Sequence, residues 1–308
     1  MNAINKNPLQ PTDVCFLSAG IRCAAYWYRP LGKGPFATIV MAHGLGGTRE
    51  QRLPAFAQRF SSAGYACLVF DYRHFGKSEG MPRQILDINK QLDDWKAAIA
   101  YARELKDVDK KKIVLWGTSF GGGHVLATAS EDHEVAAVIS QCPFTDGLAS
   151  SLAMNPLTSL SLIARALKDR AGSWFGATPV MVKLAGNPGE TALMNAPDVA
   201  SGYTAVRDGS TAPDYVAARF AMDIIRYYPG RKTPKIPAPV LFCICDNDSV
   251  APSKQTLRHA NRTPAKEIKR YGYGHFEIYV GNAFEHVIRD QLDFLQRHVP
   301  RASNESNV

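Results

Sequence analysis

A serine framed by small residues is the first feature of this sequence whose setting suggests chemistry. Residues 114–123 read VLWGTSFGGG, and residues 117–121 within them fit the pattern G-x-S-x-G. The sequence predicts a strand over residues 112–117 and a helix over residues 122–130, which is the context that this pattern needs. The glycines permit a tight bend that leaves a hydroxyl exposed, although glycine-rich turns without any activity are also common. Ser119 is therefore a candidate nucleophile.

A nucleophilic serine requires a base, because a serine hydroxyl alone is a weak nucleophile. His275 lies in the segment RYGYGHFEIY, after a predicted strand over residues 266–272. His43 and His74 occupy predicted loops upstream of Ser119. The other histidines fall on predicted helices or at their ends, where packing or surface roles are expected: His124, His133, His259, His286 and His298. His275 is therefore the candidate base.

The base needs an acid that orients it, and the acid should follow a strand between Ser119 and His275. Asp246 and Asp248 lie at the end of the apolar run in PVLFCICDNDSVAP, and Asp146 follows VISQCPFT. An aspartate at a strand end often only caps the next helix, so we expect one of Asp246 and Asp248 to have that role. Both remain candidates for the acid here, and Asp146 is a weaker third one.

Acyl transfer also requires backbone N–H groups that face the developing oxyanion, each stabilising the transition state by about 3 kcal/mol. The N–H of Phe120 directly follows the candidate nucleophile. The segment AHGLGG at residues 42–47 ends a predicted strand, and its glycines allow the loop to bring a second donor beside the serine. We expect this donor to be the N–H of Leu45, although HGxGG also fits an ordinary glycine turn.

Alternating strand and helix patterns must position these residues. Two segments around Ala19 and Gly20 predict an N-terminal hairpin over residues 13–18 and 21–28. Further strands are predicted at 36–44, 65–71, 112–117, 135–143, 238–246 and 266–272, and helices at 49–64, 85–105, 122–130, 253–261 and 286–299. Because apolar strands alternate with helices, the sequence predicts an α/β fold with a mostly parallel, twisted sheet and helices on both faces.

This alternation stops between residues 146 and 237, where helical patterns occur and no strand is convincing. We expect residues 146–237 to form a helical cap over the carboxyl edge of the sheet, where open α/β sheets bind ligands. The core then comprises residues 1–145 and 238–300, and residues 301–308 are expected to be a disordered tail. Seven apolar residues are candidates for lining a cavity above Ser119: Met154, Leu160, Leu162, Ile163, Trp174, Phe175 and Met181.

The composition restricts the classes of protein to which the chain can belong. Of its 308 residues 45% are hydrophobic and 21% are charged, which is ordinary for a soluble globular protein. The net charge of +8 comes from scattered basic residues rather than from a stripe interleaved with aromatics, which argues against nucleic-acid binding. The sequence begins without the apolar segment of a signal peptide and has no apolar run long enough to span a membrane, so we expect a cytoplasmic protein.

The sequence gives no indication of a cofactor or a metal ion. It contains no P-loop, no dinucleotide-binding glycine motif and no cluster with metal-ligand spacing. The six cysteines form no C-x-x-C pair, and most lie in apolar, strand-like runs. We therefore expect buried, reduced thiols rather than disulfides or metal ligands.

These motifs resemble those of the α/β-hydrolase superfamily over nearly the whole chain, from TIVMAHGLGG to FLQRHV. The segment FDYRHFGKSEG is similar to the family's D-x-R-G-x-G-x-S loop, from which it departs at His74 and Phe75. Residues 248–252 match D-x-x-x-P, the loop that holds the acid in this family. The resemblance therefore favours Asp248 and implies a triad in the family's chain order, Ser119, Asp248 and His275.

Within the superfamily the chain is similar to capped serine esterases and thioesterases, to lysophospholipase-like enzymes, and to fungal polyketide thiohydrolases and acyltransferases. The serine at the elbow argues against dehalogenases and epoxide hydrolases, which have aspartate there. The resemblance implies hydrolysis of a carboxylic ester or thioester of a small-to-medium apolar molecule through an acyl-serine. Two alternatives remain: an acyltransferase or thiohydrolase for a polyketide-type acyl chain, and a non-catalytic ligand-binding protein. A homodimer is also compatible with the sequence.

Overall fold

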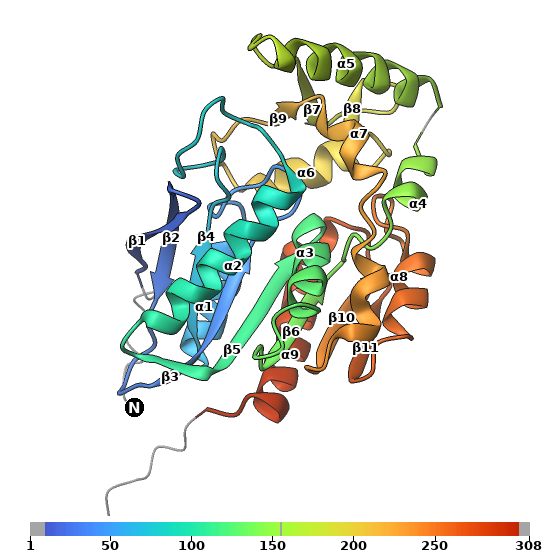
Figure 1. Ribbon diagram of the computed structural model, residues 1–308. Helices are drawn as coiled ribbons and strands as arrows, with labels where there is room; N and C mark the ends of the chain where they lie inside the picture. The colour runs from blue at the N-terminus through green and yellow to red at the C-terminus, as the bar shows by residue number, and fades with distance from the viewer. Residues whose placement is uncertain (1–9, 155, 302–308) are drawn as a thin grey trace, which may run out of the picture.

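An eight-stranded sheet forms the centre of the molecule in the computed structural model, which describes residues 10–154 and 156–301 (Figure 1). The strand order is β1-β2-β4-β3-β5-β6-β10-β11. The strands are β1 (Thr12–Ser18), β2 (Ile21–Tyr28), β3 (Phe36–Ala42), β4 (Ala66–Phe70), β5 (Val108–Thr118), β6 (Ala137–Gln141), β10 (Val240–Cys245) and β11 (Lys266–Tyr271). β1 and β2 form an antiparallel hairpin, β2 pairs antiparallel with β4, and the strands from β4 to β11 run parallel. The predicted hairpin and the mostly parallel sheet are confirmed.

The central strands are buried and mostly apolar because helices cover both faces of the sheet. Every residue of β3, β4, β6 and β10 is buried, whereas the edge strand β11 is partly exposed. Since β3, β5, β6, β10 and β11 are parallel neighbours, their carboxyl ends meet along one edge of the sheet. Ser119, Asp248 and His275 all follow strands that end at this edge.

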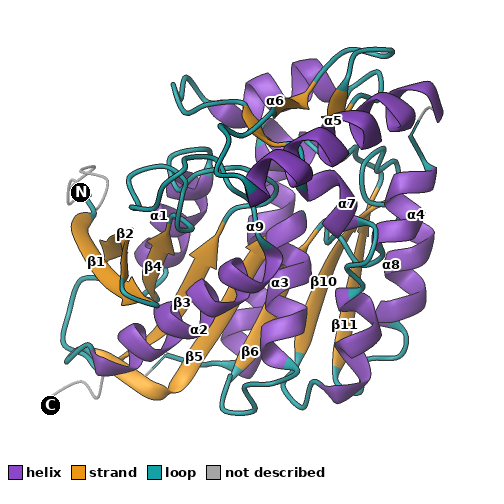
Figure 2. Cartoon of the chain, turned by 45° about the horizontal axis from the view of Figure 1, so that its top comes forward, coloured by secondary structure: helices purple, strands orange, loops and turns teal. Residues whose placement is uncertain are grey.

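Two layers of helices enclose the sheet. Helix α1 (Leu53–Ser62) packs with α9 (Gly281–His298), and α2 (Ile88–Glu104) packs with α3 (Phe120–Ala129) on the opposite face. Helix α8 (Ser253–Ala260) packs against a 3₁₀ helix (Pro229–Lys235), which in turn contacts α3. Figure 2 shows α2 and α3 in front of the strands, with α1 and α9 behind them. The five helices that were predicted around the sheet are confirmed, with ends that differ by up to five residues.

An upper layer covers the carboxyl edge of the sheet (Figures 1 and 2). Its elements are α4 (Gly147–Leu152), α5 (Pro156–Trp174), β7 (Met181–Ala185), β8 (Ala192–Met194), α6 (Val199–Arg207), β9 (Tyr215–Ala217) and α7 (Phe220–Ile224). The three strands form a separate small sheet in the order β8-β7-β9. The prediction that this segment has no strand is therefore wrong, because strands of three to five residues are too short to show an alternating pattern.

Asp169 of α5 joins the elements of the upper layer. Its buried carboxylate accepts hydrogen bonds from the backbone N–H of Val180 at 2.8 Å and from that of Arg219 at 2.9 Å. The Arg219 guanidinium also donates to it at 2.7 and 2.9 Å. This charge pair ties α5 to the segments that precede β7 and α7. The division of the chain into a core and a cap at residues 146 and 237 stays a prediction.

All six cysteines are free, as expected, but their burial differs from the prediction at one position. Cys15 is exposed on the edge strand β1, whereas Cys23, Cys67, Cys142, Cys243 and Cys245 are buried. Cys15 is exposed because the side chains of β1 alternate between two faces, and the buried face is the one that carries Phe16 and Ser18. Among the described residues, no helix combines the length and apolar character needed to cross a membrane.

Candidate active site

Ser119 occupies a tight bend between β5 and α3. Its backbone angles are φ 56° and ψ −120°, a conformation that is strained for a residue with a side chain. The surrounding glycines are required by close backbone contacts: a Cβ on Gly121 would lie 2.5 Å from the carbonyl oxygen of His43, and one on Gly117 would lie 2.2 Å from the carbonyl oxygen of Gly121. The small residues of this motif therefore let the bend pack against the end of β3.

The structure brings Ser119, His275 and Asp248 together. The Oγ of Ser119 lies 3.0 Å from Nε2 of His275, and Nδ1 of His275 lies 2.7 Å from Oδ2 of Asp248. The other carboxylate oxygen of Asp248 accepts the backbone N–H groups of Val250 and Ala251 at 2.8 and 2.6 Å. Each side chain of the His275–Asp248 pair is only 2% exposed. The carboxylate is therefore fixed on one side by its own loop and on the other by the imidazole.

The two other candidate acids lie in different environments. Asp246 forms an ion pair with Arg270, whose Nε donates at 2.8 Å, and this pair is largely exposed. Neither Asp246 nor Asp248 caps α8, so the expectation that one of them caps a helix is wrong. Asp146 is the aspartate that does so, because its side chain accepts the N–H of Ala149 at 3.0 Å at the start of α4.

The predicted oxyanion donors, the backbone N–H groups of Leu45 and Phe120, belong to two residues that line the same cavity as Ser119. Phe120 is the first residue of α3, where a backbone N–H has no acceptor within the helix. Leu45 lies in the loop after β3, and Gly44 before it approaches so closely that a Cβ there would lie 3.2 Å from the Ser119 Oγ. Among the described residues, no protein group accepts a hydrogen bond from either N–H. That these two N–H groups form the oxyanion hole stays a prediction.

A buried carboxylate organises the loop that carries Leu45. Asp71 accepts the N–H of Arg49 at 2.7 Å with one oxygen and the N–H of Lys77 at 3.0 Å with the other. Burial raises the pKa of Asp71 to about 6, and these two N–H groups oppose that rise. The buried Arg49 side chain adds an ion pair with Asp71 at 3.4 Å and stacks on Tyr26. The sequence pattern indicated only that the D-x-R segment resembles a family motif, and it did not predict that Asp71 holds the loop that carries Leu45.

A chain of buried polar side chains lies beneath the bend. The indole N–H of Trp116 donates to Gln291 at 3.0 Å, and the amide of Gln291 donates to Gln141 at 2.8 Å. Gln141 in turn donates to the hydroxyl of Thr118 at 3.2 Å, and this hydroxyl also bonds the phenol of Tyr279. The network connects the residue before Ser119 to the segment after His275. It has no sequence signature, because its members come from β5, β6, α9 and the 3₁₀ helix Glu277–Tyr279 between β11 and α9.

Two histidines near the site are neutral in the folded protein. Burial lowers the pKa of His43 to about 4, with a contribution from the nearby His275, and its ring stacks on Tyr279. Burial lowers the pKa of His124 to about 3, and its two nitrogens bond the Tyr227 hydroxyl at 2.7 Å and the Gln91 carbonyl at 2.9 Å. Neither histidine has a polar contact with Ser119, and His43 Nδ1 instead accepts the backbone N–H of Gly44 at 2.7 Å, in the loop that carries Leu45.

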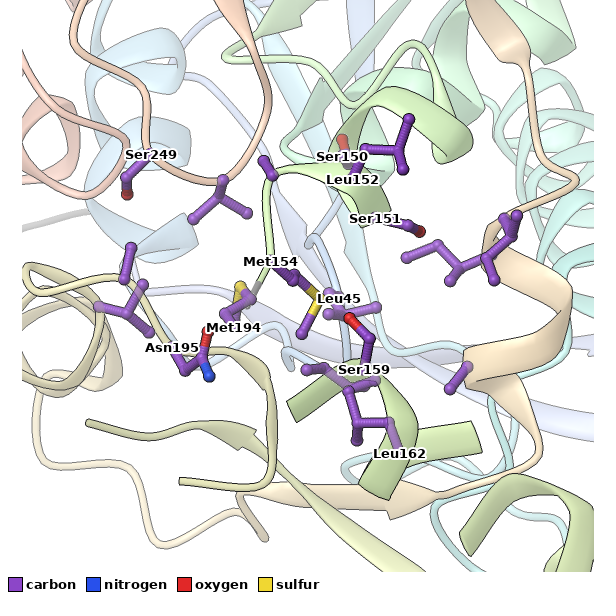
Figure 3. Close-up of a pocket in the computed structure, with 18 of the residues that line it drawn as sticks. Leu45, Ser150, Ser151, Leu152, Met154, Ser159, Leu162, Met194, Asn195 and Ser249 are labelled. Atoms are coloured by element: carbon purple, nitrogen blue, oxygen red, sulfur yellow. The ribbon is translucent and has the colours of Figure 1, made fainter. Parts of the chain in front are cut away.

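A cavity of about 680 Å³ lies between the bend and the upper layer (Figure 3). Ser119, Leu45 and Phe120 form part of its wall, and most of the remaining wall is apolar. Its polar side chains are Ser150, Ser151, Ser159, Asn195 and Ser249. The predicted lining residues Met154, Leu160, Leu162 and Ile163 are confirmed. The prediction is wrong for Trp174, Phe175 and Met181, because the cavity lies under the first half of α5, whereas Trp174 and Phe175 lie at its far end and Met181 begins β7.

Comparison with known proteins identifies the family. The sequence pattern described as serine aminopeptidase, S33, matches residues 33–279. The chain belongs to the α/β-hydrolase family. This α/β-hydrolase is 66% identical to the quorum-quenching protein AidA of Acinetobacter baumannii over 97% of the chain and 98% of that protein. It is 27% identical to the thiohydrolase aneE of Aspergillus aculeatus, with 92% of each chain covered.

Solved structures of other α/β-hydrolases share this fold. The crystal structure of the α/β hydrolase GrgF from a Penicillium species superposes with a TM-score of 0.79 at 26% identity, covering 94% of this chain and 99% of that one. The structure of Est1E from Butyrivibrio proteoclasticus with bound ferulic acid gives a TM-score of 0.64 at 20% identity, covering 93% of this chain and 99% of that one. The second likeness concerns the fold alone.

Proposed function

We propose that this α/β-hydrolase cleaves a carboxylic ester through an acyl-serine formed on Ser119, with His275 as the base and Asp248 as the acid. One observation carries the proposal. Ser119 Oγ, His275 and Asp248 form a continuous chain of hydrogen bonds at 3.0 and 2.7 Å, and the chain ends at the wall of an apolar cavity. Serine hydrolases on unrelated folds use the same arrangement of groups.

In the proposed reaction, Ser119 Oγ attacks the ester carbonyl carbon while its proton passes to Nε2 of His275. The carboxylate of Asp248 stabilises the imidazolium that forms, since it accepts the Nδ1–H at 2.7 Å. The N–H groups of Leu45 and Phe120 donate to the oxyanion of the tetrahedral intermediate. His275 then protonates the departing alkoxide. A water molecule next attacks the acyl-serine and transfers a proton to the same nitrogen, which passes it to Ser119 Oγ as the acyl–oxygen bond breaks and the free acid leaves.

The substrate that we propose is an ester with a medium-length apolar chain. A cavity of about 680 Å³ lies in the range of small-molecule sites, and its mostly apolar wall suits an alkyl chain better than a charged group. The relative that is 66% identical is named a quorum-quenching protein, which supports a bacterial signal molecule as the substrate. An N-acyl homoserine lactone would combine the two requirements, because it contains a cyclic ester and an apolar acyl chain.

A second candidate is transfer or thioester chemistry on a polyketide-type acyl chain. Relatives at 27% and 28% identity are named a thiohydrolase and a polyketide transferase, and they cover 92% and 88% of this chain. Both reactions would use the same acyl-serine. They differ from ester hydrolysis in the leaving group or in the molecule that accepts the acyl group.

A matched panel of octanoyl substrates separates these functions. The panel contains the p-nitrophenyl ester, the N-acyl homoserine lactone, an N-acetylcysteamine thioester and the primary amide, each with and without an added alcohol. We expect the purified protein to release free acid from the ester and to open the lactone, and Ser119→Ala to do neither. Turnover of the thioester alone, or an acyl-alcohol product in place of the acid, would instead establish the second candidate. Hydrolysis that is unchanged in Ser119→Ala would refute the proposed nucleophile.

A further inference from the structure

Helix α5 has apolar residues on two opposite faces. One face packs on the protein through Thr158, Leu162, Ala166 and Asp169. The opposite face is exposed and carries apolar residues at alternating spacings of three and four: Leu157, Leu160, Ala164, Leu167, Ala171 and Trp174. We call this set the α5 stripe. Leu160 is 65% exposed, Leu167 is 52% exposed and Trp174 is 77% exposed. Such spacing is that of the a and d positions of a helix that pairs with another helix.

The exposed apolar surface extends beyond the α5 stripe. Leu152 of α4 and Phe175 after α5 are also strongly exposed, and Leu148 and Ile163 are partly so. Together with the stripe, these side chains expose on the order of 1,000 Å² of apolar surface, against the roughly 300–600 Å² of the largest patch on an ordinary monomer. A stable protein interface buries about 800 Å² per partner. The area therefore matches what a dimer needs.

We propose that a second copy of this chain docks on the α5 stripe, with the two α5 helices antiparallel about a two-fold axis. The axis would pass between Ala164 and Leu167, and the sequence of α5 is complementary to itself in this register. Large side chains meet small ones in the central pairs, since Leu160 lies opposite Ala171 of the other copy and Leu167 lies opposite Ala164, whereas Leu157 lies opposite Trp174 at the two ends. A two-fold interface must be self-complementary in this way.

The charges beside the α5 stripe are compatible with the same register. Lys168 of one copy would lie beside Ser161 of the other, and Arg170 would lie beside Ile163, so no two cations would face each other. Arg170 is in addition neutralised by Asp223 at 2.6 Å within its own chain. A lipid surface is the other occupant that such a face could take, but lipid contact would not require large and small residues to alternate about a centre.

The proposed interface adjoins the cavity. Leu160 and Ile163 line the cavity and are also exposed at its outer rim. In the dimer, Ala171 and Leu167 of the second copy would cover this rim and complete its apolar wall. The proposal stands without the proposed chemistry, because it depends only on the outer face of α5.

The mass of the full-length protein in solution tests the proposal. Light scattering and sedimentation velocity should give twice the 33.7 kDa of the chain. Leu167→Glu should weaken association by roughly a hundredfold or more, because two buried leucines are lost per dimer. Leu31→Glu is the matched control, since Leu31 is 86% exposed on a loop at the opposite end of the sheet, and it should leave the dimer intact. Circular dichroism verifies that each variant is folded.

An exchange of two residues tests the register. Ala164→Leu should weaken the dimer because two large side chains would then meet at the axis, and the double variant with Ala164→Leu and Leu167→Ala should restore it. A monomeric wild-type protein would overturn the proposal, as would a dimer that persists in folded Leu167→Glu. A monomer that binds phosphatidylglycerol vesicles in a manner abolished by Leu167→Glu would assign the face to lipid and would also overturn it.

Discussion

Replacing Asp248 by asparagine should inactivate the protein while leaving its shape almost unchanged. The backbone N–H groups of Val250 and Ala251 hold one carboxylate oxygen at 2.8 and 2.6 Å, and an asparagine carbonyl would occupy the same place. The amide NH₂ would then face Nδ1 of His275. Because Nδ1 must accept that hydrogen bond, the imidazole proton would reside on Nε2, which could no longer accept the proton of Ser119.

The size of the effect follows from the same geometry. At the 2.7 Å separation of His275 Nδ1 and Asp248 Oδ2, a carboxylate stabilises an imidazolium by roughly 6 kcal/mol at an effective dielectric constant of about 20. Both side chains are 2% exposed, so solvent cannot replace the lost charge. We therefore expect kcat to fall by about 10⁴-fold. Initial rates on p-nitrophenyl octanoate measure this change, and the melting temperature checks folding.

Two matched aspartates serve as controls. Asp246→Asn should retain at least half of the activity, since its partner Arg270 is exposed and distant from the chemistry. Asp146→Asn should also remain active, because asparagine caps a helix as well as aspartate does. An active Asp248→Asn together with an inactive Asp146→Asn would show that the acid follows β6, and the assignment of Asp248 would be wrong.

Three further predictions concern the cavity, the buried histidines and the bend. On p-nitrophenyl esters kcat/KM should rise by about fourfold per methylene from acetate to octanoate, because burying each methylene contributes about 0.8 kcal/mol. A steady fall would mean a small, closed pocket. The free energy of unfolding measured with urea should rise between pH 4 and 6.5, because His43 and His124, with pKa values of about 4 and 3, must lose their protons to fold. Asp71, whose pKa is raised to about 6, acts in the opposite direction but less strongly. A flat or falling profile would contradict the burial of the two histidines. Gly121→Ala should lower the free energy of unfolding by roughly 2 kcal/mol, because its Cβ would lie 2.5 Å from a backbone carbonyl oxygen. The control Gly272→Ala should change stability little, because a Cβ there would have no atom within 4 Å. Equal melting temperatures of the two variants would refute the close contact at Gly121.

The sequence sufficed for the parts of this molecule that depend on local patterns. The buried strands and the bend at Ser119 follow from residues that adjoin one another in the chain. His275 and Asp248 could be placed because each follows a strand of recognisable composition, and parallel strands end at the same edge. The choice between Asp248 and Asp246 came from family resemblance, since both lie at the same strand end and local composition does not distinguish them.

Features that join distant segments could not be predicted. The contact of Gln141 with Gln291 spans 150 positions, and neither residue has a local pattern that marks it as buried. The hydrogen bonds of Asp71 to the loop after β3 likewise depend on how two strands pair. Periodicity identified α5 but could not decide which of its two apolar faces is buried, so Trp174 and Phe175 were assigned to the cavity although both are exposed.

Covalent labelling of Ser119 tests the central claim most directly. The bend exposes the Ser119 hydroxyl to the cavity, and its hydrogen bond to His275 at 3.0 Å prepares it for attack. Intact-mass spectrometry after treatment with a fluorophosphonate should show one adduct per chain, and peptide mapping should place it on Ser119. The variant Ser119→Ala, with an unchanged melting temperature, should gain none. An adduct that persists in Ser119→Ala, or that maps to another residue, would contradict the proposed acyl-serine mechanism.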